Sequence, residues 1–299
     1  MSHVPPATEF PATRPNRRIR TWFIMVMLLV AGLIVADGSR CTPANPNSPV
    51  MLRGENPLAT PKDQVLRVAT FNIHSGRGRD RRTDLARTAA VFSVPSDLIG
   101  LNEVRGTWNS AWRPDQAADL GQRLGLQSAF VPTERRWWHD HFGNGLLSNI
   151  PLSQVHRIPL AGTRGKAFRC ATLAQFEFQQ QTVQVLSVHV DSQSDRERQL
   201  RAVLSLFVGL QPPAILIGDL NSNQDDPQMR ELLARTDVVD ALHDAPPDQR
   251  GRQHIDWILA RGMRCRSCQL IENDASDHPA AFAELELLTS ANPRTGTEP

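Results

Sequence analysis

The sequence contains no tyrosine, two lysines and four cysteines among its 299 residues. Cysteine is too scarce for a disulfide-rich scaffold. Cys265 and Cys268 form a CxxC pair without a second one, which argues against structural zinc and leaves a disulfide or plain thiols as alternatives. The net charge is only +2, which excludes the strong basic excess of a protein that coats nucleic acid. Apolar residues make up 40% of the chain, so a sizeable core can form and disorder throughout is excluded.

Long hydrophobic runs are also scarce, and the one that stands out covers residues 22–36, WFIMVMLLVAGLIVA. As a helix it would span about 22 Å, shorter than a bilayer core of about 30 Å. This length is typical of a signal-peptide core or a short signal anchor, and Ala36 and Gly38 could flank a cleavage site. Arginines precede the run, so we expect the rest of the chain to lie outside the cytoplasm. The protein would be membrane-anchored, or secreted if the signal is cleaved.

Composition divides the chain into segments. We expect a polar N-terminal tail at 1–21, a signal anchor or signal-peptide core at 22–38, a Pro- and Asn-rich linker at 39–64, a folded domain at 65–288 and a loose tail at 289–299. The first 40 residues hold five arginines against two acidic residues, a net charge of +3. Since the whole chain carries +2, the remainder carries −1. The part expected outside the cytoplasm therefore has no basic excess of its own.

Strand-like and helix-like segments alternate from residue 65 onward, which predicts an α/β domain. Apolar, β-branched runs predict strands at 65–71, 97–101, 145–148, 155–160, 167–178, 182–190, 214–218, 254–260, 265–271 and 280–287. Helical spacing of apolar residues predicts helices at about 84–92, 115–125, 200–207 and 226–235.

Polar residues that can bind metals or phosphate follow the strong strands. They are Asn72, Glu103, His189, Asp219 with Asn221, Asp256, and Asp277 with His278. Ligand sites in layered α/β folds form where several strand ends meet. Clustered buried carboxylates require a cation, and oxygen ligands favour Mg²⁺, with Mn²⁺ or Ca²⁺ as alternatives. Each residue alone could be a turn residue, a surface charge or a satisfied core histidine, but one fold would bring all of them together.

Seven segments in order resemble the endonuclease/exonuclease/phosphatase superfamily, which includes deoxyribonuclease I, AP endonucleases and neutral sphingomyelinases. They are TFNIH at 70–74, LNEV at 101–104, GNGLLS at 143–148, SVHVD at 187–191, GDLNS at 218–222, IDWIL at 255–259 and SDHP at 276–279. The resemblance implies a four-layer α/β sandwich, with two mixed β-sheets face to face and helices outside. It also implies a metal-dependent phosphoric ester hydrolase.

The resemblance implies roles for the strand-end residues. Asn72, Glu103 and Asp277 would be metal ligands. Asp256 would orient His278, which would act as the general base on water or hold a phosphate oxygen.

The remaining residues would act on the water or the phosphoryl group. Asp219 would align the attacking water or hold a second metal. His189 and Asn221 would donate hydrogen bonds to the phosphoryl oxygens as their charge grows. Asn144 and Arg77 are weaker candidates for substrate binding.

The function remains open between three classes. A membrane-anchored phosphodiesterase or phosphatase acting on phospholipid or sphingolipid headgroups is favoured, because the anchor is accompanied by an aromatic and basic segment at 135–142. An exported nuclease for DNA or RNA is the alternative, supported by four arginines within 77–82 and opposed by the charge of −1. AP-endonuclease activity is disfavoured because Asn102 replaces the family glutamine and tyrosine is absent.

An inactive binding module on the same fold is the third class. The complete set of metal and imidazole residues argues against it. No obligate protein partner is predicted, and the pairing of Cys41, Cys170, Cys265 and Cys268 stays open.

Overall fold

The computed structural model describes residues 17–38, 50–54, 64–106, 115–136, 139–161, 168–245 and 254–288. It divides into two compact units, Met1–Ser39 and Arg40–Pro299. Several features predicted from the sequence lie outside the described residues: the ends at 1–16 and 289–299, most of the interval 39–64 with Cys41, and the Trp137–Trp138 part of the aromatic segment.

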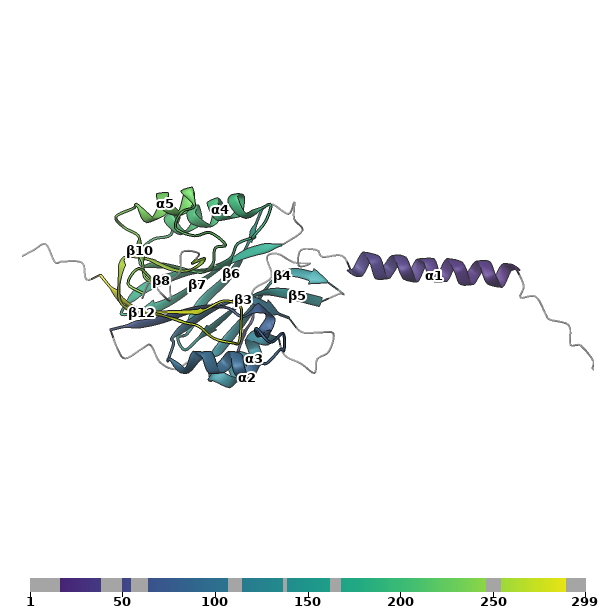
Figure 1. The fold of residues 1–299 in the computed structure, drawn as a ribbon, viewed down its shortest axis with the longest axis horizontal. Helices are drawn as coiled ribbons and strands as arrows, with labels where there is room; N and C mark the ends of the chain where they lie inside the picture. Colours follow the sequence, from purple (N-terminus) through teal and green to yellow (C-terminus); the bar gives the residue numbers. More distant parts are fainter. Residues whose placement is uncertain are drawn as a thin grey trace, which may run out of the picture. The chain divides into compact units, whose positions relative to one another are not determined.

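The first unit contains helix α1, Arg17–Gly38 (Figure 1). Its 22 residues would extend about 33 Å, longer than the uncharged run alone, because the helix also includes the arginines before it. The stretch Arg18–Val35 is long and apolar enough to cross a membrane, and a signal sequence would pass the same test. Its large apolar side chains are exposed, so nothing in this unit covers them.

The second unit contains two mixed sheets. The larger has the order β1-β4-β5-β3-β2-β13-β12 and the smaller β10-β11-β9-β8-β7-β6. The larger comprises β1 Leu52–Arg53, β2 Leu66–Asn72, β3 Leu98–Arg105, β4 Gln127–Arg136, β5 His139–Ser148, β12 Met263–Ile271 and β13 Ala280–Leu287. The smaller comprises β6 Leu152–Leu160, β7 Arg169–Phe178, β8 Gln181–His189, β9 Ala214–Asp219, β10 Val239–Asp240 and β11 Asp256–Arg261. Among these strands β2–β3 and β8–β9 pair in parallel, and the other pairs are antiparallel.

Helices cover the outer faces of both sheets (Figure 1). The larger sheet carries α2 Leu85–Ala90, α3 Gln116–Leu124 and the short 3₁₀ helices η1 His74–Gly76 and η2 Val91–Ser93. The smaller sheet carries α4 Arg196–Gly209 and α5 Pro227–Leu233. Aspartates cap α2, α3 and α5: the side chains of Asp84, Asp115 and Asp226 accept from backbone N–H groups of the first turn, which satisfies donors that a helix start leaves free.

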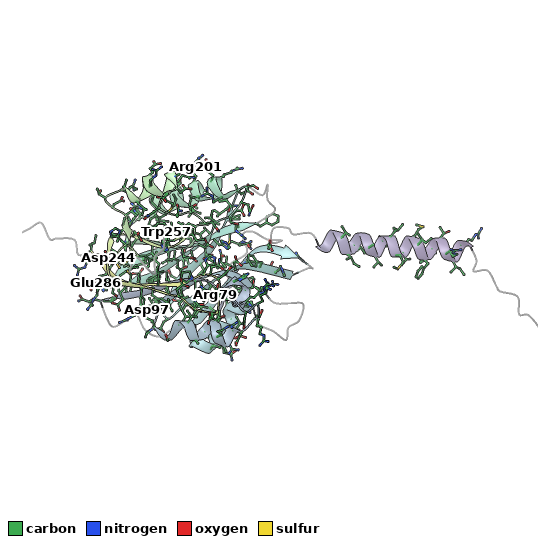
Figure 2. The ribbon with its side chains drawn as sticks, viewed as in Figure 1. Arg79, Asp97, Arg201, Asp244, Trp257 and Glu286 are labelled. Atoms are coloured by element: carbon green, nitrogen blue, oxygen red, sulfur yellow. The ribbon has the colours of Figure 1, made fainter. Side chains whose placement is uncertain are left out.

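Alternation along the strands separates three hydrophobic layers. On β2, Leu66 and Val68 face the core between the sheets, whereas Ala69 and Phe71 face the core under α2 and α3. On β11, Trp257 points into the third core, beneath α4 and α5, where its Nε1 donates to the carbonyl of Ser222 over 2.9 Å (Figure 2). Helix, sheet, sheet and helix therefore form four layers, which confirms the predicted four-layer α/β sandwich.

The predicted strands and helices are present, but the sequence analysis did not predict strands β4 and β10, and β5 begins at His139, six residues before the predicted start. The helix expected at 84–92 ends at Ala90 and continues as the 3₁₀ turn η2. The interval expected as linker contains β1, which pairs with β4. Cys265 and Cys268 both lie in β12 as free thiols, like Cys170, and burial raises the pKa of Cys265 to about 12.

Arg261 joins the end of β11 to the end of α4. Its buried guanidinium donates from Nη1 to the carbonyls of Phe207, Val208 and Leu210 over 3.1, 2.8 and 2.9 Å, and from Nε to Asp237. These carbonyls lie at the helix C-terminus, where backbone acceptors have no intrahelical partner and a cation is favourable.

Arg261→Ala should lower the free energy of unfolding by about 2–4 kcal/mol, because the carbonyls of Phe207, Val208 and Leu210 and the carboxylate of Asp237 each lose one donor. Urea denaturation would measure this loss. Arg235→Ala is the matched control, since Arg235 pairs with the same Asp237 on the surface, and it should cost less than about 1 kcal/mol. Equal losses in the two variants would contradict the capping role of Arg261.

Candidate functional site

The polar residues predicted at strand ends continue the inward-facing rows of apolar residues. On β9, Ile215 and Ile217 face the core between the sheets, and Asp219 follows two positions later on the same face. Asn72 on β2, Asn102 on β3, His189 on β8 and Asp256 on β11 follow the same rule. In the strand registers Asn72 lies opposite Asn102, and Asp219 lies opposite both His189 and Asp256. All five side chains are buried at one end of the inter-sheet core.

The two sheets approach closely beneath this cluster. A Cβ at Gly100 would lie 2.7 Å from Ile217 Cδ1 and 2.9 Å from Ser187 Oγ. Two positions later Asn102 crosses the gap: its Nδ2 donates to the Val188 carbonyl over 3.0 Å, and its Oδ1 accepts from the Asp219 N–H over 3.0 Å. Asn102 therefore fixes the larger sheet to the strand end that carries Asp219, a positioning role that the sequence analysis did not identify.

Glu103 enters the site through a distortion of β3. The register between β3 and β5 shifts between Leu101 and Val104, and Glu103 has φ +58°. His74 and Asn221 near the cluster also have positive φ, at 46° and 47°. Such conformations cost about 1–3 kcal/mol each in residues other than glycine and concentrate at functional sites. The bulge turns Glu103 towards Asn72, where an undistorted strand would point it away.

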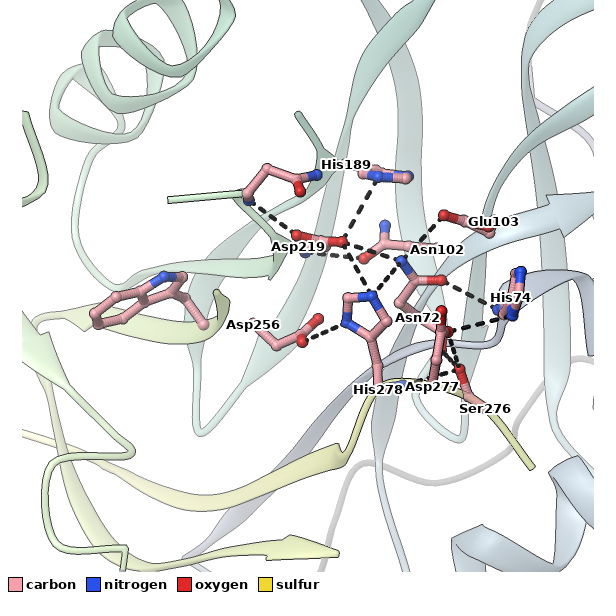
Figure 3. A network of polar contacts seen from close by, with 12 residues as sticks. Asn72, His74, Asn102, Glu103, His189, Asp219, Asp256, Ser276, Asp277 and His278 are labelled. Atoms are coloured by element: carbon pink, nitrogen blue, oxygen red, sulfur yellow. Dashed lines mark hydrogen bonds and ion pairs between the residues drawn. The ribbon is translucent and has the colours of Figure 1, made fainter. Parts of the chain in front are cut away.

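Asn72 is the centre of the polar network (Figure 3). Its Nδ2 lies 3.0 Å from Asp219 Oδ2, 3.3 Å from Glu103 Oε1 and 3.4 Å from His278 Nε2. Its Oδ1 accepts from the backbone N–H of His74 over 3.1 Å. The amide nitrogen therefore faces the carboxylates. For Asn72 to ligate a cation through its oxygen, the amide would have to turn by half a rotation.

Asp256 and His278 form the pair that the sequence predicts, with 2.8 Å between His278 Nδ1 and Asp256 Oδ2. Burial alone would lower the pKa of His278, but the hydrogen bond and charge of Asp256, with Asp219 and Asp277, raise it to about 9. Burial, reinforced by the charge of Asp256, raises the pKa of Asp219 to about 7, although His278 opposes this shift. The cluster thus concentrates negative charge that needs a neighbouring cation.

His189 contrasts with His278. Its Nε2 lies 3.6 Å from Asp219 Oδ2, yet burial, with the charges of Arg169 and His278, holds the pKa of His189 well below its usual value. The imidazole is therefore neutral near pH 7. Among the described residues its buried Nδ1 has no hydrogen-bond partner.

The other predicted site residues differ in what they contact. Asp277 has a side chain that is 58% exposed and lies 3.3 Å from His74 Nδ1, on the rim of the network (Figure 3). Asn221 donates its amide to the Val190 carbonyl, and its N–H donates to Asp219 Oδ1. Asn144 is buried: it accepts from Asn102 Nδ2 and donates to the Cys170 carbonyl. Arg77 is exposed, and its Nε donates to the Arg81 carbonyl.

Three side chains have the geometry of a cation site. One ligand atom each from Asp219, Asp256 and His278 lies within 4.8 Å of the others. Glu103 adds a partly buried carboxylate that contacts Asn72. The donor set is rich in oxygen, which suits Mg²⁺ or Mn²⁺ better than zinc. One oxygen of the buried Asp256 carboxylate, Oδ1, has no hydrogen-bond partner among the described residues, so this carboxylate has a free coordination position.

Arg169, at the start of β7, is a candidate site residue that the sequence analysis missed. Its guanidinium lies over the Phe142 ring, 5.9 Å from the centroid, and its charge helps to lower the pKa of His189. Its buried Nε has no partner among the described residues. A partly buried guanidinium whose charge acts on His189 is suited to binding a phosphate oxygen near that ring. No motif marks it in the sequence, because it becomes a candidate only when β7 lies beside β8.

Comparison with known proteins gives a consistent result. Residues 69–278 match the Endonuclease/Exonuclease/phosphatase family. A comparison with curated proteins finds no match. Among solved structures, an endonuclease/exonuclease/phosphatase from Beutenbergia cavernae is 21% identical, with a TM-score of 0.62, over 75% of this chain and 72% of that one.

Two further structures share the fold. The human Nocturnin catalytic domain, solved with a bound sulfate, is 19% identical with a TM-score of 0.58, over 80% of this chain and 98% of that one. TDP2 of D. rerio, complexed with a single-stranded DNA product, is 18% identical with a TM-score of 0.54, over 75% of this chain and all of that one.

Arg169→Gln should reduce kcat/KM for a phosphodiester about 10- to 100-fold, because a charge-assisted hydrogen bond contributes about 1.5–3 kcal/mol. Steady-state hydrolysis of bis(4-nitrophenyl) phosphate with Mg²⁺ would measure the effect. Arg201→Gln is the control, since Arg201 lies on the outer side of α4, paired with Glu197 (Figure 2). Equal activity of Arg169→Gln and the control would exclude Arg169 from the site.

Proposed function

The chain belongs to the endonuclease/exonuclease/phosphatase family, and from this premise we propose that it is a divalent-metal-dependent phosphodiesterase or phosphatase held at a membrane by α1, with its substrate among phospholipid or sphingolipid headgroups. Members of this family are generally phosphoester hydrolases that depend on a divalent metal. One observation carries the proposal. Glu103, Asp219 and His278 all contact the amide nitrogen of Asn72, and Asp256 contacts the other ring nitrogen of His278.

The residues present fit a divalent cation. Asp219 and Asp256 are buried carboxylates within reach of one another, and burial, with the charge of Asp256 as a second cause, raises the pKa of Asp219. In the proposal Glu103 and Asn72 hold the metal, with Asp277 as a further ligand, while Asp219 is available to a second ion. A bound Mg²⁺ would supply positive charge next to the phosphoryl oxygens.

The side chains supply the remaining chemistry. Asp256 fixes the His278 ring through Nδ1, which leaves Nε2 facing Asp219 and Asn72. From this position His278, whose raised pKa keeps it protonated near pH 7, donates to a phosphoryl oxygen, and it acts as a base on water only in its deprotonated form. Asp219, held by its backbone bond to Asn102, orients the water. Neutral His189 and the guanidinium of Arg169 donate to the oxygens on which charge accumulates.

Two features support a headgroup substrate. The helix α1 has the length and composition of a membrane anchor, which would concentrate the enzyme at a lipid surface. The described part of the second unit has no broad basic excess, in keeping with the sequence balance. A headgroup phosphate needs only a local positive charge such as Arg169, whereas a nucleic-acid backbone is usually bound by a basic stripe.

An exported nuclease is the second candidate. Exposed arginines follow the Asn72 strand end at Arg77, Arg79, Arg81 and Arg82. Arg79 forms an ion pair with Glu272 over 2.8 Å, so part of this charge is neutralised. D. rerio TDP2, which shares the fold, was solved with a single-stranded DNA product, and this observation keeps nucleic acid among the substrates to test.

The deciding experiment offers the purified protein, with Mg²⁺, plasmid DNA and mixed phospholipid–sphingolipid vesicles in parallel. Release of headgroup or phosphate from vesicles, with DNA intact, is the expected result. Cleavage of DNA alone would establish the nuclease. Asp219→Ala serves as the blank, and activity retained in that variant would indicate a contaminant.

Glu103→Gln and His278→Ala should each lower the turnover of a hydrolysed phosphodiester by about 10²–10⁴-fold, the range associated with a positioned acid–base or charge-stabilising group. Both variants should keep the wild-type circular dichroism spectrum. His156→Ala, which removes an exposed histidine of β6, is the matched control and should retain full activity. Wild-type turnover in either site variant would remove that residue from the proposed machinery.

Mg²⁺ should raise the melting temperature of the protein, because a ligand that binds only the folded state contributes RT ln(1 + [L]/Kd), about 1.4 kcal/mol at ten times Kd. Differential scanning fluorimetry with and without EDTA would measure the shift. The shift should shrink or vanish in Glu103→Gln. An undiminished shift in that variant would place the ion elsewhere, and no shift in the wild type would argue against a resident metal.

A further inference from the structure

Gln116 joins the two chain segments that carry Asn72 and Glu103. Its Nε2 donates to the Ser75 carbonyl over 2.7 Å, and its Oε1 accepts from the Arg105 backbone N–H over 2.9 Å. Ser75 lies three residues after Asn72, and Arg105 lies two residues after Glu103. One amide side chain therefore bridges the segments that follow two of the proposed metal ligands.

The segment after Asn72 has a strained backbone. His74, Ser75 and Gly76 have φ values of +46°, +58° and +70°. Such conformations are costly in residues other than glycine, and they persist only where the surrounding structure fixes them. The same turn holds the Asn72 side chain, because the His74 N–H donates to Asn72 Oδ1 over 3.1 Å. A movement of this turn would therefore change the position of the Asn72 amide.

The bulge at Glu103 lies just beyond the end of the pairing between β2 and β3. That pairing ends at Asn102. Glu103 follows with φ +58°, and the register between β3 and β5 resumes at Val104. The next backbone N–H, that of Arg105, donates to Gln116. Gln116 therefore takes the place of β2 as a hydrogen-bond partner of β3 immediately after the bulge.

The start of helix α3 holds Gln116 in place. The preceding residue, Asp115, is buried, and its side chain accepts from the Ala118 N–H and from Arg53 Nη1, each over 2.8 Å. Gly76 lies directly against the amide, since a Cβ at Gly76 would lie 3.3 Å from Gln116 Nε2. The amide is therefore fixed at the helix start and packed against the strained turn.

A cation held by both Asn72 and Glu103 depends on the separation of these two side chains. They come from neighbouring strands, with 3.3 Å between Asn72 Nδ2 and Glu103 Oε1. The backbone has positive φ at Glu103 itself and two residues after Asn72, so regular strand pairing does not determine this separation. Partners that orient metal ligands from outside typically change metal affinity or activity about 10- to 100-fold when they are removed. The contact of one side chain with both segments gives Gln116 this kind of influence.

We propose that Gln116 is a positioning residue that holds Asn72 and Glu103 at the separation required to bind one divalent cation. It acts through the backbone of Ser75 and Arg105, and it contacts neither the cation nor the substrate. This inference rests on the metal-binding role proposed for Asn72 and Glu103. Because metal binding can be measured without hydrolysis and compared between variants, the inference and the proposed function can fail separately.

The test measures Mn²⁺ binding to the purified full chain by electron paramagnetic resonance of the free ion. Gln116→Met removes both hydrogen bonds but keeps a long side chain with high helix propensity. The dissociation constant for Mn²⁺ should rise about 10-fold, at the lower end of the range for partners of metal ligands, because Gln116 acts through the backbone. Gln122→Met, at an exposed glutamine of the same helix, is the matched control and should leave the constant unchanged.

Hydrolysis of bis(4-nitrophenyl) phosphate provides a second readout. In Gln116→Met the Mg²⁺ concentration for half-maximal activity should rise by the same factor. The KM at saturating Mg²⁺ should stay within about twofold of the wild-type value, because no contact with substrate is lost. Gln116→Ala removes the same two hydrogen bonds and should give the same results, so it replaces Gln116→Met if that variant does not fold.

The contrary outcomes are distinct. Equal dissociation constants in Gln116→Met and Gln122→Met, with Mn²⁺ bound by the wild type, would overturn the inference and leave the proposed function standing. A melting temperature that falls while the constant stays unchanged would show a purely structural role and also overturn the inference. Absence of Mn²⁺ binding by the wild type would overturn the proposed metal dependence, and this inference with it.

Discussion

The candidate site depends on how closely two separate sheets are held together. Asn72 and Glu103 belong to the larger sheet and His189, Asp219 and Asp256 to the smaller, so every distance between the two groups is a distance between sheets. Asn102 sets that distance through its bonds to Val188 and Asp219, just above the close approach at Gly100. Because packed interiors resist small displacements, this contact holds the site residues of the two sheets at fixed distances from one another. Asn144, which bonds to Asn102 from β5, extends the same support, and this explains its burial better than direct contact with substrate does.

The electrostatics follow from this packing. Burial removes water from Asp219 and Asp256 and places both beside His278, so one carboxyl gains a raised pKa while the imidazole stays protonated to about pH 9. His189, a short distance away, is kept neutral by burial and by Arg169. His189 and His278 thus acquire different protonation states from their surroundings, as acid–base chemistry requires. A cation and an anionic phosphate can both enter such a site, because it offers negative charge on one side and neutral or positive donors on the other.

Much of this could be predicted from the sequence because period-two alternation is a strong signal. Where an inward-facing row ends in Asn72, His189 or Asp219, the polar residue must lie beside its neighbours at the same end of the core. The sequence could not show the bulge that redirects Glu103, since positive φ in a glutamate leaves no compositional trace. Nor could it show Arg169 or Asn102, whose importance arises only when distant strands become neighbours. The two-residue strand β1 could not be predicted from the sequence for a similar reason. Its stability comes from the ion pair with Asp115 and from pairing with the edge of β4, not from its own strand propensity.

The topology also determines which end of the larger sheet can carry the site. The site uses the carboxyl ends of the parallel strands, so the first strand of the pair, β2, must start at the opposite end. One antiparallel edge strand reverses this direction, and the free edge of β4 is available to pair with it. The direction of β2 and β3 therefore decides which end of the larger sheet carries the site, and β1 adds an edge strand without changing that end.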